Sequence, residues 1–434
     1  MNFVQLWQDL EPIGITDRGY RRYSWTRIDA QCRQWFIDQA TARCLDVVPD
    51  RNGNLWAWWG RPGPGAIVTG SHLDSVPDGG AFDGPLGVVS ALAAIDLLRE
   101  RGVTPTRPIA VVVFVEEEGA RFGLACLGSK LLTGAVDPDR ARELTDDEGI
   151  AYADAFAAAG FDPAGIGPDD ELLASIDAFI ELHIEQGRAL AALSAAPAVP
   201  ASMSMAPSIP VEPRFLQQSV GANETWDCAP AGAIALAEGI WPHGRWRFDF
   251  GGRPDHAGTA RFADRNDPLV PFASTVLAAR RGAAERGALA TFGKVSVEPG
   301  AVNGVPRAVR AWLDARAPDE ATLRDVLSHV RYECQGVCDE HGVSLEVRQE
   351  SATAAVRFDG RLRERIGKVL GGPPALPTGA GHDAGVLAAR VPTAMLFVRN
   401  PTGVSHSPAE RAEPADCEAG VRALAAVLEE LALT

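Results

Sequence analysis

The feature that most constrains the fold lies before residue 190, where short apolar runs typical of strands alternate with segments whose apolar residues recur at helical spacing. Ala66–Gly70 and Ile109–Val115 are short apolar runs rich in β-branched residues, as expected of strands buried on both faces. Ile176–Ile184 is interpreted as another buried strand. Between the first two runs, Gly84–Arg101 has apolar residues at helical spacing and ends in Arg-Gly, an acceptable helix stop. This β-α-β order predicts a largely parallel sheet covered by helices, with functional groups just beyond the carboxyl ends of its strands.

The sequence pattern changes after Gly187, because residues 189–235 are rich in Ala, Pro and Ser and lack periodicity. A compact set of elements follows, which we interpret as strand Arg245–Phe250, helix Pro268–Arg281, strands Ala290–Val297 and Val309–Arg316, helix Glu320–His341 and strand Val343–Gln349. Their β-α-β-β-α-β order is that of a split βαβ sandwich. The chain then returns to α/β texture, with a helix over 360–371, a strand over Pro392–Val398 and a helix from about Ala409 to Leu431.

These patterns predict an α/β protein with a mixed, mostly parallel sheet in its catalytic domain and an inserted ferredoxin-like lid domain. The length of 434 residues suits two or three domains with cores of their own. We place the catalytic domain at 1–188 and 352–434, the lid at 236–351 and an irregular insertion at 189–235.

The charge balance excludes several partner classes. The chain has 41 Lys and Arg against 57 Asp and Glu, a formal net charge of −16, which argues against broad binding of nucleic acid or anionic membranes. No secretion signal is visible at the N-terminus, and prolines 197, 200, 207 and 210 make the uncharged stretch Ala189–Val211 a poor membrane span. We therefore expect a cytoplasmic enzyme with a small-molecule substrate.

The cysteines do not predict any covalent or metal cross-link in this fold. The seven cysteines are odd in number and scattered, and no CxxC pair occurs. Neither a disulfide framework nor a thiolate zinc site is predicted by these spacings.

Four short segments concentrate histidines and acids at predicted strand ends or helix starts. They are Gly70–Pro77, Phe82–Pro85, Glu116–Gly119 and Glu181–Gly187. Each segment alone has a plain interpretation as a hydrogen-bonded surface histidine or a solvated acidic loop. Adjacent carboxylates at the end of an apolar strand are costly unless cations or solvent neutralise them, so their coincidence favours a metal site, typically of zinc or manganese.

Six motifs carry a specific resemblance. In chain order they are GSHLDSVPDGGAFDGPLGV, EEEGARF, ELHIEQG, DHAGTARFADRND, GAGHDA and GVSHSPAE. Together they resemble the N-carbamoyl-L-amino-acid hydrolase and allantoate amidohydrolase family, which belongs with dinuclear-metal aminoacylases, dipeptidases and carboxypeptidases. The resemblance covers nearly the whole chain except residues 189–235.

The resemblance implies two divalent metal ions per subunit, manganese or zinc, with cobalt or nickel as alternatives. The first metal would be held by His72, Asp83 and His183, and the second by Asp83, Glu118 and His406, so that Asp83 bridges the two. The family pattern gives Asp74 the role of fixing the tautomer of His72, and gives Glu117 the role of general base. Because strand alternation would point Glu117 and Glu118 to opposite faces, these roles require a bend there.

The resemblance also implies substrate contacts, which map onto Gln186, His256, Asn303, Arg316, Gly381 and His382. Arg316 suits a substrate carboxylate because its planar guanidinium binds both oxygens. His256 resembles the lid histidine that polarises the scissile carbonyl. His382 remains open between a structural role and substrate contact. In such enzymes the lid also carries the contact of a homodimer.

The expected activity is hydrolysis of a ureido (N-carbamoyl) C–N bond in a small carboxylated substrate, with release of ammonia. We favour allantoate over an N-carbamoyl-L-amino acid. The alternatives are an aminoacylase or dipeptidase of the same superfamily and a non-catalytic binding protein on the same scaffold.

Overall fold

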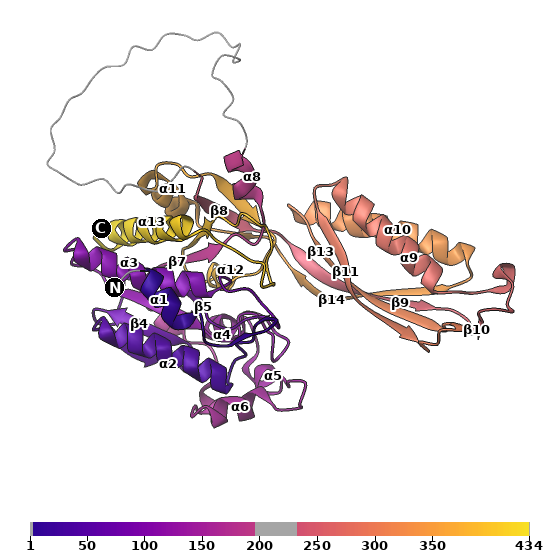
Figure 1. Ribbon diagram of the computed structural model, residues 1–434, viewed down its shortest axis with the longest axis horizontal. Helices are drawn as coiled ribbons and strands as arrows, with labels where there is room; N and C mark the ends of the chain where they lie inside the picture. The colour runs from indigo at the N-terminus through magenta and orange to yellow at the C-terminus, as the bar shows by residue number, and fades with distance from the viewer. Residues whose placement is uncertain (1–2, 196–231, 434) are drawn as a thin grey trace, which may run out of the picture. The chain divides into compact units, whose positions relative to one another are not determined.

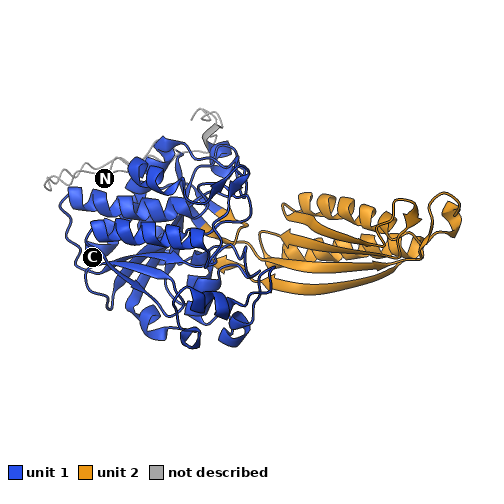
Figure 2. Cartoon of the chain, turned by 60° about the horizontal axis from the view of Figure 1, so that its bottom comes forward, with its two compact units in different colours: residues 1–237, 358–376, 382–434 blue, residues 238–357, 377–381 orange. Residues whose placement is uncertain are grey.

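The computed structural model describes residues 3–195 and 232–433, which form two compact units (Figures 1 and 2). Unit 1 comprises Met1–Ala237, Phe358–Leu376 and His382–Thr434, and unit 2 comprises Glu238–Arg357 and Pro377–Gly381. The chain therefore enters unit 2 twice, and the second passage is a short segment just before His382.

A mixed sheet forms the centre of unit 1. Its strand order is β15-β8-β17-β7-β5-β6-β4-β3, with β16 paired to β8. The four central strands, β17 (Thr393–Val398), β7 (Ile176–Ile184), β5 (Ala66–His72) and β6 (Ile109–Phe114), run parallel to one another. Strands β4 and β8 join this group antiparallel, on either side. The predicted mixed, mostly parallel sheet is thus confirmed, and the carboxyl ends of its parallel strands lie at one edge.

Helices cover the sheet because they are apolar on the faces that meet it. Helix α3 (Pro85–Glu100) is buried along most of its length and packs against β5, β7 and helix α13 (Pro414–Leu433). Strands β5 and β6 are buried at every residue, which explains why their sequences are continuous apolar runs. Among the described residues, no helix combines the length and the apolar character needed to cross a membrane.

Smaller elements complete unit 1 and its junctions. The helices are α1 (Phe3–Leu10), α2 (Arg27–Ala42), α4 (Leu127–Thr133), α5 (Pro138–Arg142), α6 (Tyr152–Ala158), η1 (Pro163–Gly165), α7 (Asp170–Ser175), α11 (Gly360–Val369) and α12 (Asp383–Leu387). The strands are β1 (Ile15–Thr16), β2 (Gly19–Tyr20), β3 (Asp46–Pro49), β4 (Leu55–Trp59), β8 (Ile234–Ile240), β15 (Val356–Arg357) and β16 (Ala375–Thr378).

Two predicted boundaries are corrected. Part of the predicted irregular insertion is the helix α8 (Ala189–Ala195), while residues 196–231 lie outside the described residues. Helix α8 begins here because the Glu185 carboxylate accepts the Ala189 and Leu190 amides, which a helix start otherwise leaves unpaired. The last helix begins at Pro414 rather than near Ala409, because the residues before it form a loop anchored by Glu410.

Unit 2 contains a four-stranded antiparallel sheet in the order β11-β13-β9-β14. Its main elements run β9 (His243–Gly251), α9 (Leu269–Ala284), β11 (Leu289–Glu298), β13 (Ala308–Arg316), α10 (Glu320–Glu340) and β14 (Ser344–Thr353). Helices α9 and α10 pack on each other and on one face of the sheet, where Phe248, Leu313 and Val330 form part of the core (Figure 1). The short elements β10 (Asp255–His256), η3 (Phe262–Asp264) and β12 (Gly304–Val305) connect these elements.

Candidate active site

The four motif segments of unit 1 meet at the carboxyl ends of its parallel strands. His72 is the last residue of β5, His183 lies near the end of β7, and Glu116–Glu118 follow β6 directly. Asp83 comes just before the first turn of α3. Because adjacent parallel strands end at the same edge, this placement brings their side chains together.

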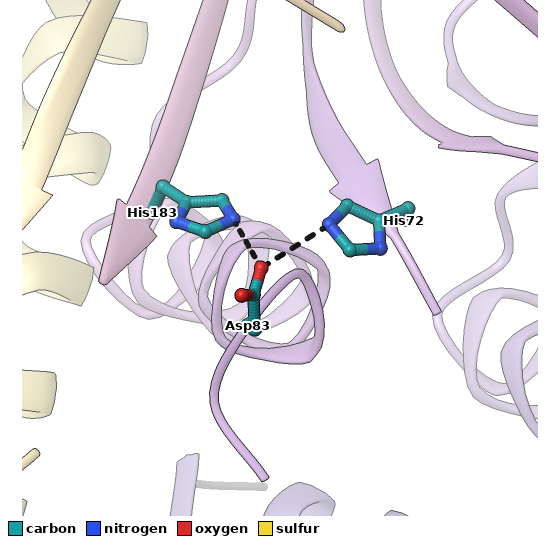
Figure 3. Close-up of side chains that lie close together, drawn as sticks. All are labelled: His72, Asp83 and His183. Carbon is teal, nitrogen blue, oxygen red and sulfur yellow. Dashed lines mark ion pairs between the residues drawn. The ribbon is translucent and has the colours of Figure 1, made fainter. Parts of the chain in front are cut away.

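The first candidate metal group consists of His72, Asp83 and His183 (Figure 3). The Asp83 Oδ1 atom lies 3.1 Å from His183 Nε2 and 3.6 Å from His72 Nε2. All three side chains are buried, and neither imidazole Nε2 has a hydrogen-bond partner. Buried polar nitrogens without partners are rare, and two of them converging on one carboxylate oxygen suit a cation.

The two imidazoles are oriented by backbone carbonyls. His72 Nδ1 lies 3.1 Å from the carbonyl oxygen of Asp74, and His183 Nδ1 lies 2.8 Å from that of Ile184. With a proton on Nδ1, each imidazole donates a hydrogen bond to its carbonyl, and its Nε2 atom faces Asp83. Burial alone would lower the pKa of His72, but the carboxylates of Glu117, Asp74 and Asp83 outweigh it and raise the pKa well above its ordinary value.

The second candidate group consists of Asp83, Glu118 and His406. His406 Nε2 lies 3.4 Å from Asp83 Oδ2 and 3.5 Å from Glu118 Oε2. Asp83 therefore presents Oδ1 to the first group and Oδ2 to the second, as a bridging carboxylate must. Burial would raise the pKa of Asp83, but His183, His406 and His72 outweigh it and hold that pKa well below its ordinary value.

The turn after β6 supplies the bend that the sequence required. Glu116 adopts the left-handed conformation with φ 52°, which ends the alternation of the strand. The Asp74 carboxylate then accepts the backbone N–H groups of Glu117 and Glu118 at 3.2 and 3.0 Å. Its Oδ1 lies 3.5 Å from His72 Nδ1, farther than the Asp74 carbonyl oxygen. In this geometry the carboxylate chiefly holds the glutamate turn, and the carbonyl orients His72.

Glu117 is buried beside the first candidate metal group. It is 6 % exposed, and its Oε2 lies 3.7 Å from His72 Nε2. Its other oxygen, Oε1, accepts the thiol of Cys126 at 3.2 Å. Burial raises the pKa of Glu117 well above its ordinary value, and the charge of His72 opposes this shift. A carboxyl group with a raised pKa beside a cation-binding group is suited to take up and return a proton.

Glu116, for which the sequence suggested no role, is structural. Its Oε1 accepts the backbone N–H groups of Arg121 and Phe122 at 3.1 and 2.7 Å and so ties down the loop that follows. Burial raises its pKa to about 7.

Asp83 has supports that sequence reasoning missed. The Glu410 Oε1 atom accepts the backbone N–H groups of Phe82 and Asp83 at 2.8 and 2.9 Å. Gln186 Nε2 donates to Asp83 Oδ2 at 2.7 Å, and Ser405 Oγ does so at 3.3 Å. Gln186, predicted to bind substrate, therefore contacts the bridging carboxylate. The signal for Glu410 was its place four residues after His406 in the same motif.

A second layer of buried polar groups lies beneath the histidines. The His382 ring centroid is 4.5 Å from that of His183, and burial, followed by the charge of His183, lowers the pKa of His382 well below its ordinary value. Glu181 accepts the Ser71 hydroxyl at 2.7 Å and the Ala384 N–H at 2.9 Å. His382 is thus a neutral, buried neighbour of the first metal group.

The other predicted substrate residues belong to unit 2. His256 and Asn303 are exposed and are brought together where β10 pairs with β12, with the Ala257 N–H donating to the Asn303 carbonyl at 2.9 Å. Arg316 ends β13, where its Nε donates to Asp314 Oδ1 at 2.9 Å and its Nη1 donates to the Gly379 carbonyl. The predicted pocket residue Gly381 ends the short second passage through unit 2.

Comparison with known proteins defines the class of this chain. It belongs to the peptidase family M20/M25/M40, whose sequence profile matches residues 45–430. It is 32% identical to an N-carbamoyl-L-amino acid amidohydrolase of Geobacillus stearothermophilus, over 99% of this chain and 98% of that protein. It is 31% identical to an allantoate amidohydrolase of Escherichia coli (strain K12), over 93% of this chain and 90% of that protein.

A solved structure agrees with this assignment. An amidase of the hydantoinase/carbamoylase family from Burkholderia multivorans superimposes with a TM-score of 0.80 at 27% identity, covering 100% of this chain and 98% of that one. The resemblance drawn from the six sequence motifs is therefore confirmed.

Proposed function

We propose that this protein is a metal-dependent amidohydrolase that cleaves the ureido C–N bond of a small carboxylated substrate. The observation that carries the proposal is the position of Asp83, whose two oxygens face two separate histidine-containing groups. Amidohydrolase names among full-length relatives support the reaction class. Within this class we favour allantoate over an N-carbamoyl-L-amino acid.

The side chains present fit two divalent cations. His72, His183 and Asp83 would hold one, and His406, Glu118 and Asp83 would hold the other. Imidazole and carboxylate donors without sulfur suit manganese or zinc, with cobalt or nickel as alternatives. The buried Nε2 atoms of His72 and His183, which make no hydrogen bond, would each bind a metal ion beside Asp83.

When bound by these residues, two such cations would lower the pKa of a water molecule and polarise the scissile carbonyl. We propose that Glu117 takes the proton of the attacking water and returns it to the leaving nitrogen. Its position supports this role, because its Oε2 faces the first metal group while the Asp74 carboxylate holds its backbone. Water adds to the ureido carbon and the C–N bond breaks, so that the leaving nitrogen departs as an amine on the shortened acid. The other fragment is carbamic acid, which decomposes to ammonia and carbon dioxide.

Substrate recognition is assigned to unit 2, which we propose acts as a ferredoxin-like lid. Arg316 would bind the substrate carboxylate, His256 would stabilise the developing oxyanion, and Asn303 would add a polar contact. The contacts of Arg316 with Asp314 and Gly379 support this assignment, because they fix the guanidinium before any ligand binds.

The test is ammonia release by protein purified without chelator and supplied with manganese. Allantoate, ureidoglycolate and several N-carbamoyl-L-amino acids are assayed side by side, and the metal content of each preparation is measured. We expect release from at least one ureido acid and about two metal ions per chain. A metal-loaded protein that releases no ammonia from any of them would refute the proposal.

A second candidate is an aminoacylase or dipeptidase, because the family profile is that of a peptidase. The same residues would then hydrolyse an acyl or peptide amide. N-acetyl amino acids and dipeptides in the same assay separate the two, since only this candidate predicts release of a free amino acid without ammonia.

We further propose a homodimer formed through unit 2. Strand β11 is an edge of the four-stranded sheet, and Leu289 and Val295 on it are 60 % and 51 % exposed. An edge strand with exposed apolar residues is a ready surface for pairing with a second copy. Sedimentation velocity is expected to give the mass of a dimer, and Val295→Lys is expected to shift the protein toward monomer.

A further inference from the structure

A third group of buried ligand-type side chains lies behind Glu117. It consists of Glu117, Cys126 and Asp383, whose nearest ligand atoms all lie within 4.8 Å of one another. The Cys126 thiol is 3.2 Å from Glu117 Oε1, on the side away from the oxygen that faces His72. We propose that these three residues form an inhibitory site for a soft divalent cation such as cadmium or zinc.

The geometry is close to what such an ion requires. In a tetrahedral zinc site, thiolate sulfur and carboxylate oxygen lie about 3.6 Å apart, as follows from the usual bond lengths. The separation of Cys126 Sγ and Glu117 Oε1, 3.2 Å, needs to change by only a few tenths of an ångström. Three protein ligands with one open position are an ordinary set for zinc.

Asp383 gives independent support for a cation site. Its side chain is fully buried, and Ser129 donates to Oδ1 at 2.5 Å. Its other oxygen, Oδ2, is buried without a hydrogen-bond partner. A buried carboxylate oxygen normally has a partner, and a cation would supply it, while Ser129 would orient the carboxylate from outside.

The backbone holds Cys126 in place beside Glu117. The Cys126 N–H donates to the Glu117 carbonyl at 2.6 Å, and the Leu127 N–H donates to the Glu116 carbonyl at 3.0 Å. Cys126 itself has φ 55°, in the left-handed region. The Cys126 backbone is therefore held beside Glu117, and the thiol reaches Glu117 from this fixed position.

The chemistry of the sulfur selects the ion. Thiolates prefer soft or borderline cations, whereas manganese and magnesium prefer oxygen. The two groups assigned to the catalytic metals contain no sulfur among their residues. An ion in the third group would occupy Glu117 Oε1 and keep this carboxylate from accepting a proton. The inhibitory effect, unlike the binding, rests on the proposed function.

The binding test uses the full-length, manganese-loaded protein titrated with cadmium chloride. Cadmium bound by a thiolate gives an ultraviolet charge-transfer band, so cadmium in the sulfur-free groups is silent. We expect the wild-type protein to show this band at one thiolate-bound cadmium per chain. Cys126→Ser is expected to lose the band, and the matched variant Cys334→Ser, altered at a buried cysteine of unit 2, to keep it. An undiminished band in Cys126→Ser would overturn the proposal.

A second variant keeps the thiol, so that the proposal can still be tested if Cys126→Ser fails to fold. Asp383→Asn is expected to require a higher cadmium concentration for half-maximal absorbance, and an unchanged titration would overturn the role of Asp383. Residual activity is followed in parallel, and each variant is normalised to its own cadmium-free rate. We expect excess cadmium or zinc to inhibit the wild-type protein more strongly than Cys126→Ser. If no substrate is found, the proposed function fails while the absorbance still reports on this site.

Discussion

Replacing Glu117 by Gln isolates proton transfer from metal binding. Glutamine has nearly the same shape, and its amide oxygen can still accept the Cys126 thiol that now contacts Oε1 at 3.2 Å. Glu117 belongs to neither group assigned to the catalytic metals, so the variant should retain its metal content. What it loses is a carboxylate able to accept a proton beside the first metal group.

The expected magnitude follows from general base catalysis, which contributes about 10²–10⁴-fold to a rate. At about 1.4 kcal/mol per tenfold change, the barrier rises by about 3–5 kcal/mol. We expect kcat for ammonia release to fall by this factor while KM changes much less. Steady-state kinetics on the best ureido substrate, with metal analysis of the same sample, measures both.

The matched control is Glu116→Gln, the same substitution one residue earlier. Glu116 is equally buried, but its Oε1 only accepts two backbone N–H groups, which an amide oxygen also accepts. We expect kcat to stay within a few-fold of the wild-type value. If Glu117→Gln retains full activity, or if both variants lose activity equally, the assignment of Glu117 as the base is wrong.

Three further predictions address the metals and the substrate. Glu410→Ala leaves the Asp83 amide without its acceptor and should weaken metal binding about 10–100-fold in competition titrations, whereas Glu410→Gln should restore most of it. Arg316→Ala removes charge-assisted hydrogen bonds worth about 1.5–3 kcal/mol and should raise KM for carboxylated substrates about 10–100-fold, with a smaller change in kcat. Chelation should lower Tm more at pH 8 than at pH 5. Burial raises the pKa values of Glu118 and Glu410 to about 7 from 4.5, so the metal-free native state binds more protons than the unfolded chain and loses stability as pH rises through this window. Equal shifts of Tm at both pH values would contradict this linkage.

The sequence predicted the central elements well because their patterns are local. Strands β5, β6 and β7 are short and mostly apolar, and the structure places them within two residues of the predicted bounds. The rule that parallel strands end at one edge then brought His72 and His183 together without knowledge of any contact. Helix α8 was missed because its start depends on the Glu185 side chain rather than on apolar spacing.

The supports of the site could not be predicted in the same way. Glu410 contacts the Asp83 amide across 327 residues of sequence, and Ser129 contacts Asp383 across 254. No local pattern reports such distances. The cysteine spacing likewise argued against a thiolate metal site, since the group around Cys126 draws its other ligands from separate segments.

Several residues of the site have a strained backbone conformation that neighbouring hydrogen bonds must hold in place. Among the described residues other than glycine, six have positive φ, and three of them, Glu116, Cys126 and His406, lie in or next to the groups of ligand-type side chains. Each such conformation costs about 1–3 kcal/mol and persists only where surrounding contacts hold it. The Asp74 carboxylate holds the turn after Glu116, and the hydrogen bonds donated by the Cys126 and Leu127 N–H groups at the start of α4 hold Cys126. The left-handed conformations turn the backbone at Glu116, Cys126 and His406. Hydrogen bonds to Asp74 and within residues 116–127 hold the first two of these turns. This arrangement explains why the motifs identify the reacting side chains while their geometry depends on residues elsewhere in the chain.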